Sequence, residues 1–239
     1  MTQRRRQMNK IAVSDHFKEI YEDYYEGGNY EWRRLGALGK AENIVSLCKS
    51  LPHNYILEIG AGDGAILKRL SELNFGKELY AIEISTSGIE AIMKNYIPCL
   101  IESRLFDGYI VPYDDDRFDI AILSHVIEHV EHPRQLIYEA SRVAKYVFVE
   151  VPLEDTMRMK NNFVFDKVGH INSYSSKTIR RFLQSCNLKL LGEKVTNPSI
   201  HKKGLLIYYV KQFMLQFSPY LATSLFTYHA SLICEKDIG

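Results

Sequence analysis

The chain has 239 residues, of which 46% are hydrophobic, and this length suits one α/β domain with additions around a single core. A formal net charge of +1 provides no strong field for nucleic acid, and the cationic run at residues 4–6 is typical of a solvated tail. Four scattered cysteines without a C-x-x-C pair indicate reduced thiols. No signal-peptide core and no long apolar run are found, so we expect a cytoplasmic protein without a transmembrane span.

Two helices are predicted before the first strand. Aromatic and apolar residues recur at helical spacing over residues 17–25, and Gly27 follows this pattern. A second helix is predicted over residues 38–48, before Pro52. We expect residues 1–50 to form a helical cap, which either only packs on the sheet or also closes over the site as a lid.

The first predicted strand is followed by a glycine turn and then by a helix. Gly60, Gly62 and Gly64 allow close approach of the backbone to a ligand, and the helix N-terminus offers free N–H groups. A pyrophosphate-binding turn needs G-x-G-x-x-G, but the third glycine comes one residue early in this chain. The carboxylates of Glu58 and Asp63 border the turn, so the pattern favours a cationic ligand over a diphosphate.

This pattern of one acid and three glycines resembles motif I of the class I S-adenosylmethionine (SAM) methyltransferases, whose cofactor carries an ammonium and a sulfonium. The resemblance implies a Rossmann-like α/β fold with a seven-stranded, mostly parallel sheet of order 3-2-1-4-5-7-6 and helices on both faces. It implies that residues 51–239 bind SAM, with Ala61 among the turn residues, and release S-adenosylhomocysteine. A cation of the cap, which is Arg33, Arg34 or Lys40, would pair with the carboxylate of the cofactor.

Two further acids have the spacing of cofactor contacts. Glu83 ends the second predicted strand about twenty residues beyond the glycines, where an acid binds ribose hydroxyls, and Ile84 follows it. Asp107 precedes Pro112 by five residues, which resembles the family's segment that binds the adenine amino group. A simple turn at Asp107-Gly108 is the competing interpretation. The third strand is predicted between these acids, over residues 97–101.

The segment after the fourth predicted strand contains His125, Glu128 and His129. It resembles the H-x-x-E-H-V-x-x-P segment of small-molecule methyltransferases, and we expect it to face the reaction centre, with Ser124 at the cofactor. The histidines would act as general base or orienting group, or would only hydrogen-bond within the loop. His170, in a G-H-x-N turn after the fifth strand, is a third catalytic candidate.

A metal is the alternative for this segment. His125, Glu128 and His129 would share one face if the segment were helical. Ubiquinone-pathway and small-RNA 2′-O-methyltransferases bind a divalent cation through a similar E-x-x-E-H pattern, but His125 replaces the first glutamate in this chain. We therefore assign no metal ligand from the sequence and keep metal-assisted O-methylation as the second interpretation.

An amphipathic insertion is predicted at residues 200–224, with an apolar face that we expect to pack on the domain or to form a dimer interface, and less readily to dock on a membrane surface. That face consists of Leu206, Tyr209, Val210, Phe213 and Phe217. The resemblance implies methyl transfer from SAM to an oxygen or nitrogen of a small-molecule acceptor by a monomer or homodimer, without nucleic acid. A SAM-binding protein that lacks catalysis is the remaining alternative.

Overall fold

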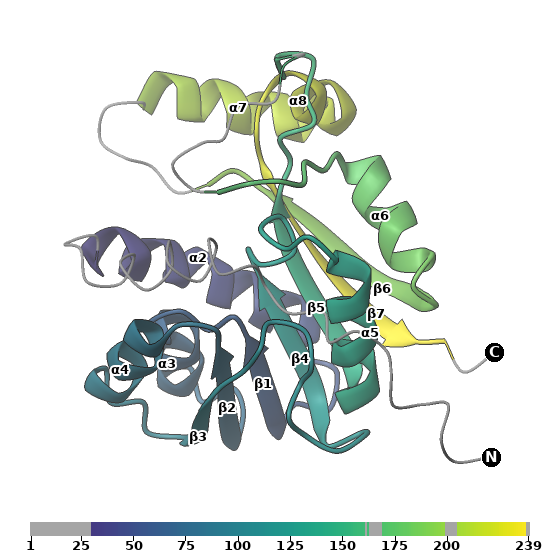
Figure 1. Cartoon of the computed structure of the whole chain (residues 1–239). Coiled ribbons are helices and arrows are strands. Elements are labelled where there is room, and N and C mark those ends of the chain that lie inside the picture. Colours follow the sequence, from purple (N-terminus) through teal and green to yellow (C-terminus); the bar gives the residue numbers. More distant parts are fainter. Residues whose placement is uncertain (1–29, 161, 163–168, 199–204, 238–239) are drawn as a thin grey trace, which may run out of the picture.

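The computed structural model describes residues 30–160, 162, 169–198 and 205–237, so the helix predicted over residues 17–25 lies outside the described residues. Seven strands form one sheet in the order β3-β2-β1-β4-β5-β7-β6 (Figure 1). Adjacent strands from β3 to β5 are parallel, and β7 runs antiparallel to both of its neighbours, which confirms the predicted topology. The strands are β1 (Tyr55–Ile59), β2 (Glu78–Glu83), β3 (Leu100–Leu105), β4 (Phe118–Ser124), β5 (Ala144–Pro152), β6 (Leu188–Thr196) and β7 (His229–Lys236).

Helices cover both faces of the sheet. One core layer joins α2, α3 and α4 to side chains such as Ile56 and Phe148, and the opposite layer joins α5 and α6 to side chains such as Leu57 and Val149. This alternation along β1 and β5 follows from the two-residue period of a strand whose two faces are both buried. The helices are α2 (Tyr30–Cys48), α3 (Ala65–Glu72), α4 (Thr86–Lys94), α5 (Pro133–Val143), α6 (Ser176–Gln184), α7 (Leu205–Phe217) and α8 (Pro219–Leu225).

The edge strand β3 begins later than the sequence pattern predicts. The N–H of Leu100 donates to the carbonyl of Ile97 at 3.1 Å, so a turn occupies most of the predicted strand over residues 97–101. The observed strand continues through a polar stretch to Leu105, and most of its side chains are only partly buried or exposed. An edge strand needs no continuous apolar run. The prediction of β3 from hydrophobicity therefore placed the strand too early in the sequence.

Helix α7 packs against the domain through a different face than the spacing of its apolar residues predicts. The predicted apolar face is exposed, with Leu206 78% and Phe217 68% accessible, so packing of that face on the domain is wrong. The half-buried side consists of Tyr208, Lys211, Gln212, Met214 and Leu215. Lys211 Nζ donates to the carbonyl of Thr227 at 2.7 Å, which explains why a lysine lies on the inner side. None of the helices in the described part of the chain combines the length and hydropathy that crossing a membrane requires.

Candidate active site

The glycine turn after β1 depends on backbone conformations that favour glycine. The φ angles are +72° at Gly60, +58° at Gly62 and +74° at Gly64. A Cβ on Gly60 would lie 2.8 Å from Val126 Cγ2, a side chain of the segment after β4. The turn therefore brings bare backbone against the end of β4, as a ligand-binding turn requires.

Two buried carboxylates lie beside this turn. Glu83 Oε2 accepts from the N–H of Gly62 at 2.9 Å, and Glu83 Oε1 accepts from the N–H and the hydroxyl of Ser85. These three bonds use most of the four lone-pair positions of a carboxylate and leave about one for a ligand hydroxyl. Glu58 is 2% exposed, and its Oε2 has no hydrogen bond from any described residue.

Burial gives both carboxylates unusual protonation. Burial raises the pKa of Glu58 well above its usual value; the charges of Asp63 and Glu83 add to this effect, whereas the charge of Lys40 opposes it. Burial also raises the pKa of Glu83, against the hydrogen bonds from Gly62 and Ser85. A cationic ligand that enters this space would relieve the repulsion among the three acids.

The cations of α2 differ in their positions. Arg33 Nε lies 2.7 Å from Asp63 Oδ2, and Arg33 and Lys40 both line the central cavity. Arg34 pairs with Glu31 on the exposed side of the helix and does not line the cavity. The structure thus leaves Arg33 and Lys40 as the cations that are within reach of a bound cofactor.

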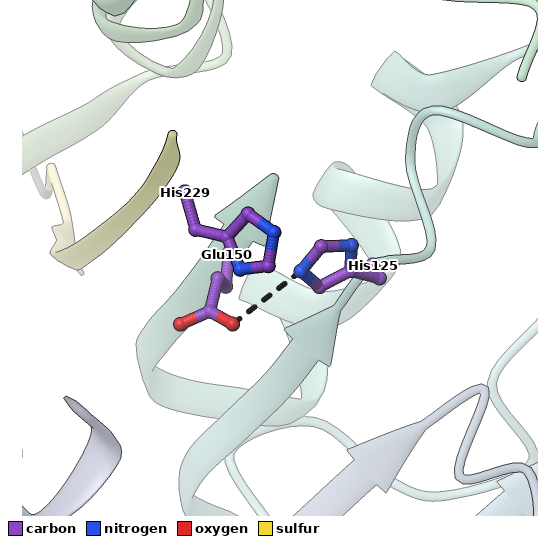
Figure 2. Close-up of side chains that lie close together, drawn as sticks. All are labelled: His125, Glu150 and His229. Carbon is purple, nitrogen blue, oxygen red and sulfur yellow. Dashed lines mark ion pairs between the residues drawn. The ribbon is translucent and has the colours of Figure 1, made fainter. Parts of the chain in front are cut away.

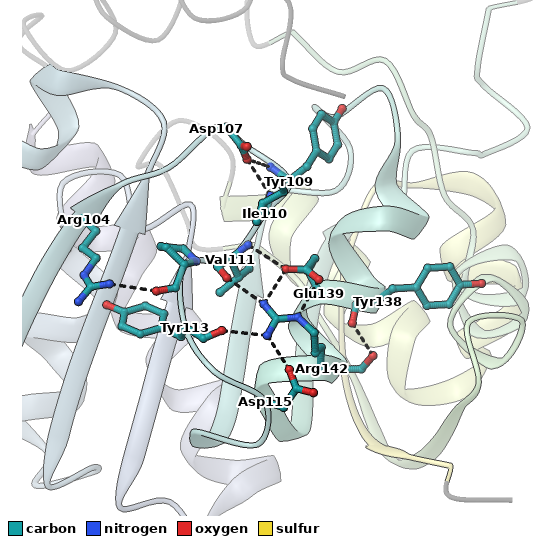
Figure 3. A network of polar contacts seen from close by, with 12 residues as sticks. Arg104, Asp107, Tyr109, Ile110, Val111, Tyr113, Asp115, Tyr138, Glu139 and Arg142 are labelled. Atoms are coloured by element: carbon teal, nitrogen blue, oxygen red, sulfur yellow. Dashed lines mark hydrogen bonds and ion pairs between the residues drawn. The ribbon is translucent and has the colours of Figure 1, made fainter. Parts of the chain in front are cut away.

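The loop after β3 has a polar scaffold (Figure 3). Asp107 Oδ1 accepts from the N–H groups of Tyr109 and Ile110, which is the turn that the competing interpretation predicts, and Asp107 does not line the cavity. Arg142 of α5 donates to Glu139, to Asp115 and to two carbonyls of this loop. The loop is therefore fixed to α5 by a network that places the neighbouring Gly108 at the cavity wall.

The segment after β4 is not helical, because residues 127–129 form a turn and His125 has a φ of +58°. His125, Glu128 and His129 therefore do not share one helical face. His129 and His170 still come together, with ring centroids 4.7 Å apart. His129 Nδ1 lies 3.3 Å from the carbonyl of Gly169, and His170 Nδ1 lies 2.8 Å from Glu154 Oε2. Burial lowers the pKa of His129 below its usual value, against the charge of Glu128.

One cavity of about 1070 Å³ connects these parts. Two predicted site residues, Gly64 and Asp107, do not line it, and a Cβ on Gly64 would instead lie 2.8 Å from Ile97 Cδ1. The predicted site residues that do line it are Glu58, Gly60, Ala61, Gly62, Glu83, Ile84, Gly108, Ser124, His125, His129 and His170. Tyr208 and Gln212 of α7 also line it, so the insertion supplies part of the wall.

Glu150 and His229 are among the polar residues of this cavity that sequence reasoning missed (Figure 2). Glu150 lies inside an apolar run that indicates only a buried strand, and His229 follows it by almost eighty residues. The antiparallel pairing of β5 with β7 brings His229 opposite Pro152, two residues beyond Glu150. Only the order of the strands could have indicated this proximity.

Comparisons with known proteins agree with the fold. A family model described as a methyltransferase domain matches residues 33–193. An uncharacterized protein of Methanocaldococcus jannaschii is 26% identical over 135 residues, which are 56% of this chain and 57% of that protein, so the chain spans little more than half of its length.

Two solved structures share the fold at low identity. Magnesium protoporphyrin IX methyltransferase from Synechocystis, solved with bound S-adenosylhomocysteine, has a TM-score of 0.61 at 15% identity over 92% of this chain and 99% of its own. The methyltransferase in a complex with the Trm112 methyltransferase activator of Haloferax volcanii has a TM-score of 0.68 at 11% identity, over 93% and 98% of the two chains.

The sheet order and the glycine turn define the class of Rossmann-like methyltransferases. The chain belongs to the methyltransferase-domain family. S-adenosylmethionine is the cofactor that the sequence resemblance implies for this domain. Two features of the cavity fit this cofactor. The buried Glu58 Oε2 has no hydrogen bond from any described residue and is available to a ligand. The glycine turn leaves space that a Cβ on Gly60 would fill.

Proposed function

We propose that this enzyme methylates an oxygen or nitrogen atom of a small-molecule acceptor that binds beside His129 and His170. The observation that carries the proposal is the shared cavity, which is lined by the glycine turn and also by both histidines. Its volume of about 1070 Å³ is at the upper end for small-molecule sites, so it has room for a cofactor and a small acceptor together. The balanced net charge gives no support for a nucleic-acid acceptor.

Particular residues would hold the cofactor. The free Oε2 of Glu58 suits the ammonium group, and Glu83 suits a ribose hydroxyl, with Ala61 and Ile84 in the adjacent wall. Arg33 or Lys40 would pair with the carboxylate. Gly108, which lines the cavity, would lie beside the adenine, and Ser124 would lie at the methionine part.

The histidines would act on the acceptor. SAM supplies an electrophilic methyl group, so the protein needs mainly to align the nucleophile and to exclude water. His129 and His170 lie with their rings together in the cavity, and contacts to Gly169 and Glu154 orient them. One histidine of the pair would accept the proton of the acceptor, and the other would orient the acceptor. His125, at the end of β4, would be a further base or orienting group.

The cap and the insertion would close the site. Residues of α2 from Arg33 to Asn43 line the cavity, and so do residues of α7. This placement supports a lid role for residues 1–50 and an acceptor-selecting role for residues 200–224. The exposed apolar face of α7 would serve a homodimer or a membrane surface, and a cytoplasmic location accords with the reduced cysteines predicted from the sequence.

The test is turnover with a panel of phenol, carboxylate and amine acceptors, read as formation of S-adenosylhomocysteine. We expect accumulation with at least one acceptor class and loss of activity in the His129→Ala variant. A protein that binds SAM but transfers no labelled methyl to any pool of small molecules would be the non-catalytic SAM-binding alternative.

Metal-assisted O-methylation is the second candidate. Ligand atoms of Glu128, His129 and His170 lie within 4.8 Å of one another, and Glu128 Oε1 also lies 3.1 Å from His125 Nδ1. Turnover measured with and without a chelator separates the candidates. Activity that survives chelation supports the simple histidine mechanism, and activity restored only by added metal supports the second one.

A further inference from the structure

A second group of metal-type donors lies in the same cavity, on different residues. His125 follows β4, Glu150 belongs to β5 and His229 begins β7, so three adjacent strands each supply one donor (Figure 2). Their ligand atoms all lie within 4.8 Å of one another. Glu150 and His229 lie on two paired strands, and His125 directly follows a third strand of the same sheet.

The distances suit direct coordination. His125 Nε2 lies 3.5 Å from Glu150 Oε1. Bonds of about 2.0–2.1 Å in a tetrahedral zinc site separate neighbouring donors by about 3.4 Å. These two atoms therefore already have the spacing of adjacent ligands, and a ring nitrogen of His229 lies within 4.8 Å of both.

Both facing atoms are buried without hydrogen bonds. Glu150 is fully buried, and neither its Oε1 nor His125 Nε2 has a hydrogen-bond partner among the described residues. A buried carboxylate oxygen normally accepts a hydrogen bond, and an unsatisfied one in a native protein requires an explanation such as an ion. A cation between these atoms would satisfy both at once.

The remaining atoms of the two ligands are oriented by neighbours. Glu150 Oε2 accepts from Asn43 at 3.0 Å and from Ser231 at 2.5 Å, which leaves Oε1 for the cavity. His125 Nδ1 lies 3.1 Å from Glu128 Oε1. Metal-bound histidines commonly donate their second ring N–H to a carboxylate, so Glu128 occupies the supporting position for His125.

Local backbone and charge agree with this role. His125 has a φ of +58°, a conformation that non-glycine residues adopt rarely and that is concentrated at functional sites. The fully buried acidic side chains of Glu150 and Glu128 provide negative charge that attracts a cation.

We propose that His125, Glu150 and His229 bind one divalent transition-metal ion of the zinc class. Two imidazoles and one carboxylate suit zinc, cobalt or iron(II) and not magnesium, which prefers oxygen ligands. Three protein ligands leave a coordination position open to the cavity. An acceptor oxygen would take this position, a consequence that rests on the proposed function, whereas binding of the ion does not.

The direct test is titration of chelator-treated protein with Zn²⁺ against a chromophoric indicator, without SAM or acceptor. We expect one equivalent of tight binding, and at least about 100-fold weaker binding in the His229→Ala variant. His170→Ala, in the other donor group, and His53→Ala, which stacks on Phe75 away from the cavity, should bind like the wild type. Absence of tight Zn²⁺ binding, or loss in His170→Ala with retention in His229→Ala, would overturn the assignment.

Three further measurements keep the test decisive. Co²⁺ in place of Zn²⁺ should give a visible absorption band that is lost in Glu150→Gln and His229→Ala, and an unchanged band in both would contradict the proposal. Circular dichroism verifies that the variants are folded. Calorimetry with SAM on the same samples separates the two claims, because SAM binding without Zn²⁺ binding refutes the metal site alone.

Discussion

Arg33 Nε lies 2.7 Å from Asp63 Oδ2, and this ion pair joins helix α2 to the glycine turn that follows β1. Both side chains are largely buried, 12% and 6% exposed. Asp63 also accepts from the N–H of Ala65 at 3.2 Å, so the same carboxylate stabilises the first turn of α3. The cap and the cofactor turn are therefore coupled through one acid.

This coupling can be measured with a double-mutant cycle of Arg33→Gln and Asp63→Asn. We expect a coupling energy of about 1–3 kcal/mol in urea unfolding, because removal of either partner leaves a buried charge. The exposed pair Arg34–Glu31, on the same helix, is the matched control and should show at most about 0.5 kcal/mol. Equal coupling in the two pairs would contradict the assigned role of Arg33.

Glu58→Gln should separate stability from cofactor affinity. The folded pKa of Glu58 is raised by burial, so its contribution to stability is present below the unfolded pKa and is lost as pH rises through the folded value. The glutamine variant cannot ionise, and its stability relative to the wild type should increase from pH 5 to pH 8 in urea unfolding. Its affinity for SAM should fall, since the carboxylate that faces the ammonium is gone. A variant that loses stability relative to the wild type as pH rises would refute this account of Glu58.

Gly60→Ala tests the close approach at the turn. The added Cβ would lie 2.8 Å from Val126 Cγ2, and the φ of +72° disfavours any side chain. We expect a loss of about 1–3 kcal/mol in unfolding free energy together with weaker SAM binding. Gly36→Ala is the control, because its Cβ meets no atom within 4 Å, and it should be neutral or stabilising by up to about 1 kcal/mol. Similar losses in both variants would show that the turn is not specially constrained.

His129→Ala and His170→Ala should slow turnover unequally. We expect turnover to fall about 100-fold when the residue that accepts the proton is replaced, and to fall less when the orienting residue is replaced. Both decreases should be smaller for more acidic acceptors. His132→Ala, an exposed neighbour in the same segment, should retain wild-type turnover. Unchanged turnover in both histidine variants would remove their proposed role.

The inverted packing of α7 predicts different costs for two neighbouring residues. Phe213, which is 62% exposed, should change the unfolding free energy by less than about 0.5 kcal/mol when replaced by serine. Leu215 packs against the core, and its replacement by serine should cost about 1–2 kcal/mol. Light scattering on the Phe213→Ser variant also reports whether this face holds a dimer. A larger loss at Phe213 than at Leu215 would mean that α7 packs through the opposite face.

The sequence predictions succeeded where a feature is encoded by residues that are close together in the sequence. The glycine turn and Glu83 could be identified because a buried strand, three glycines and an acid follow one another at fixed spacing, and the sheet order then followed from the family resemblance. The face of α7 that packs on the domain could not be predicted, because apolar residues of this helix occur on all of its sides. The hydrogen bond from Lys211 to the carbonyl of Thr227, which lies outside the helix, could not be predicted either. His229 reaches Glu150 only through pairing of β5 with β7, which no local pattern encodes.

The central claim is that the cavity beside Gly60, Glu58 and Glu83 binds a sulfonium nucleoside and not a dinucleotide. Isothermal titration calorimetry of the full chain with SAM, S-adenosylhomocysteine and NAD⁺ tests it most directly. The account predicts saturable one-to-one binding of the first two compounds and no detectable heat of binding for NAD⁺. Binding of NAD⁺ with no heat from either SAM or S-adenosylhomocysteine would contradict it.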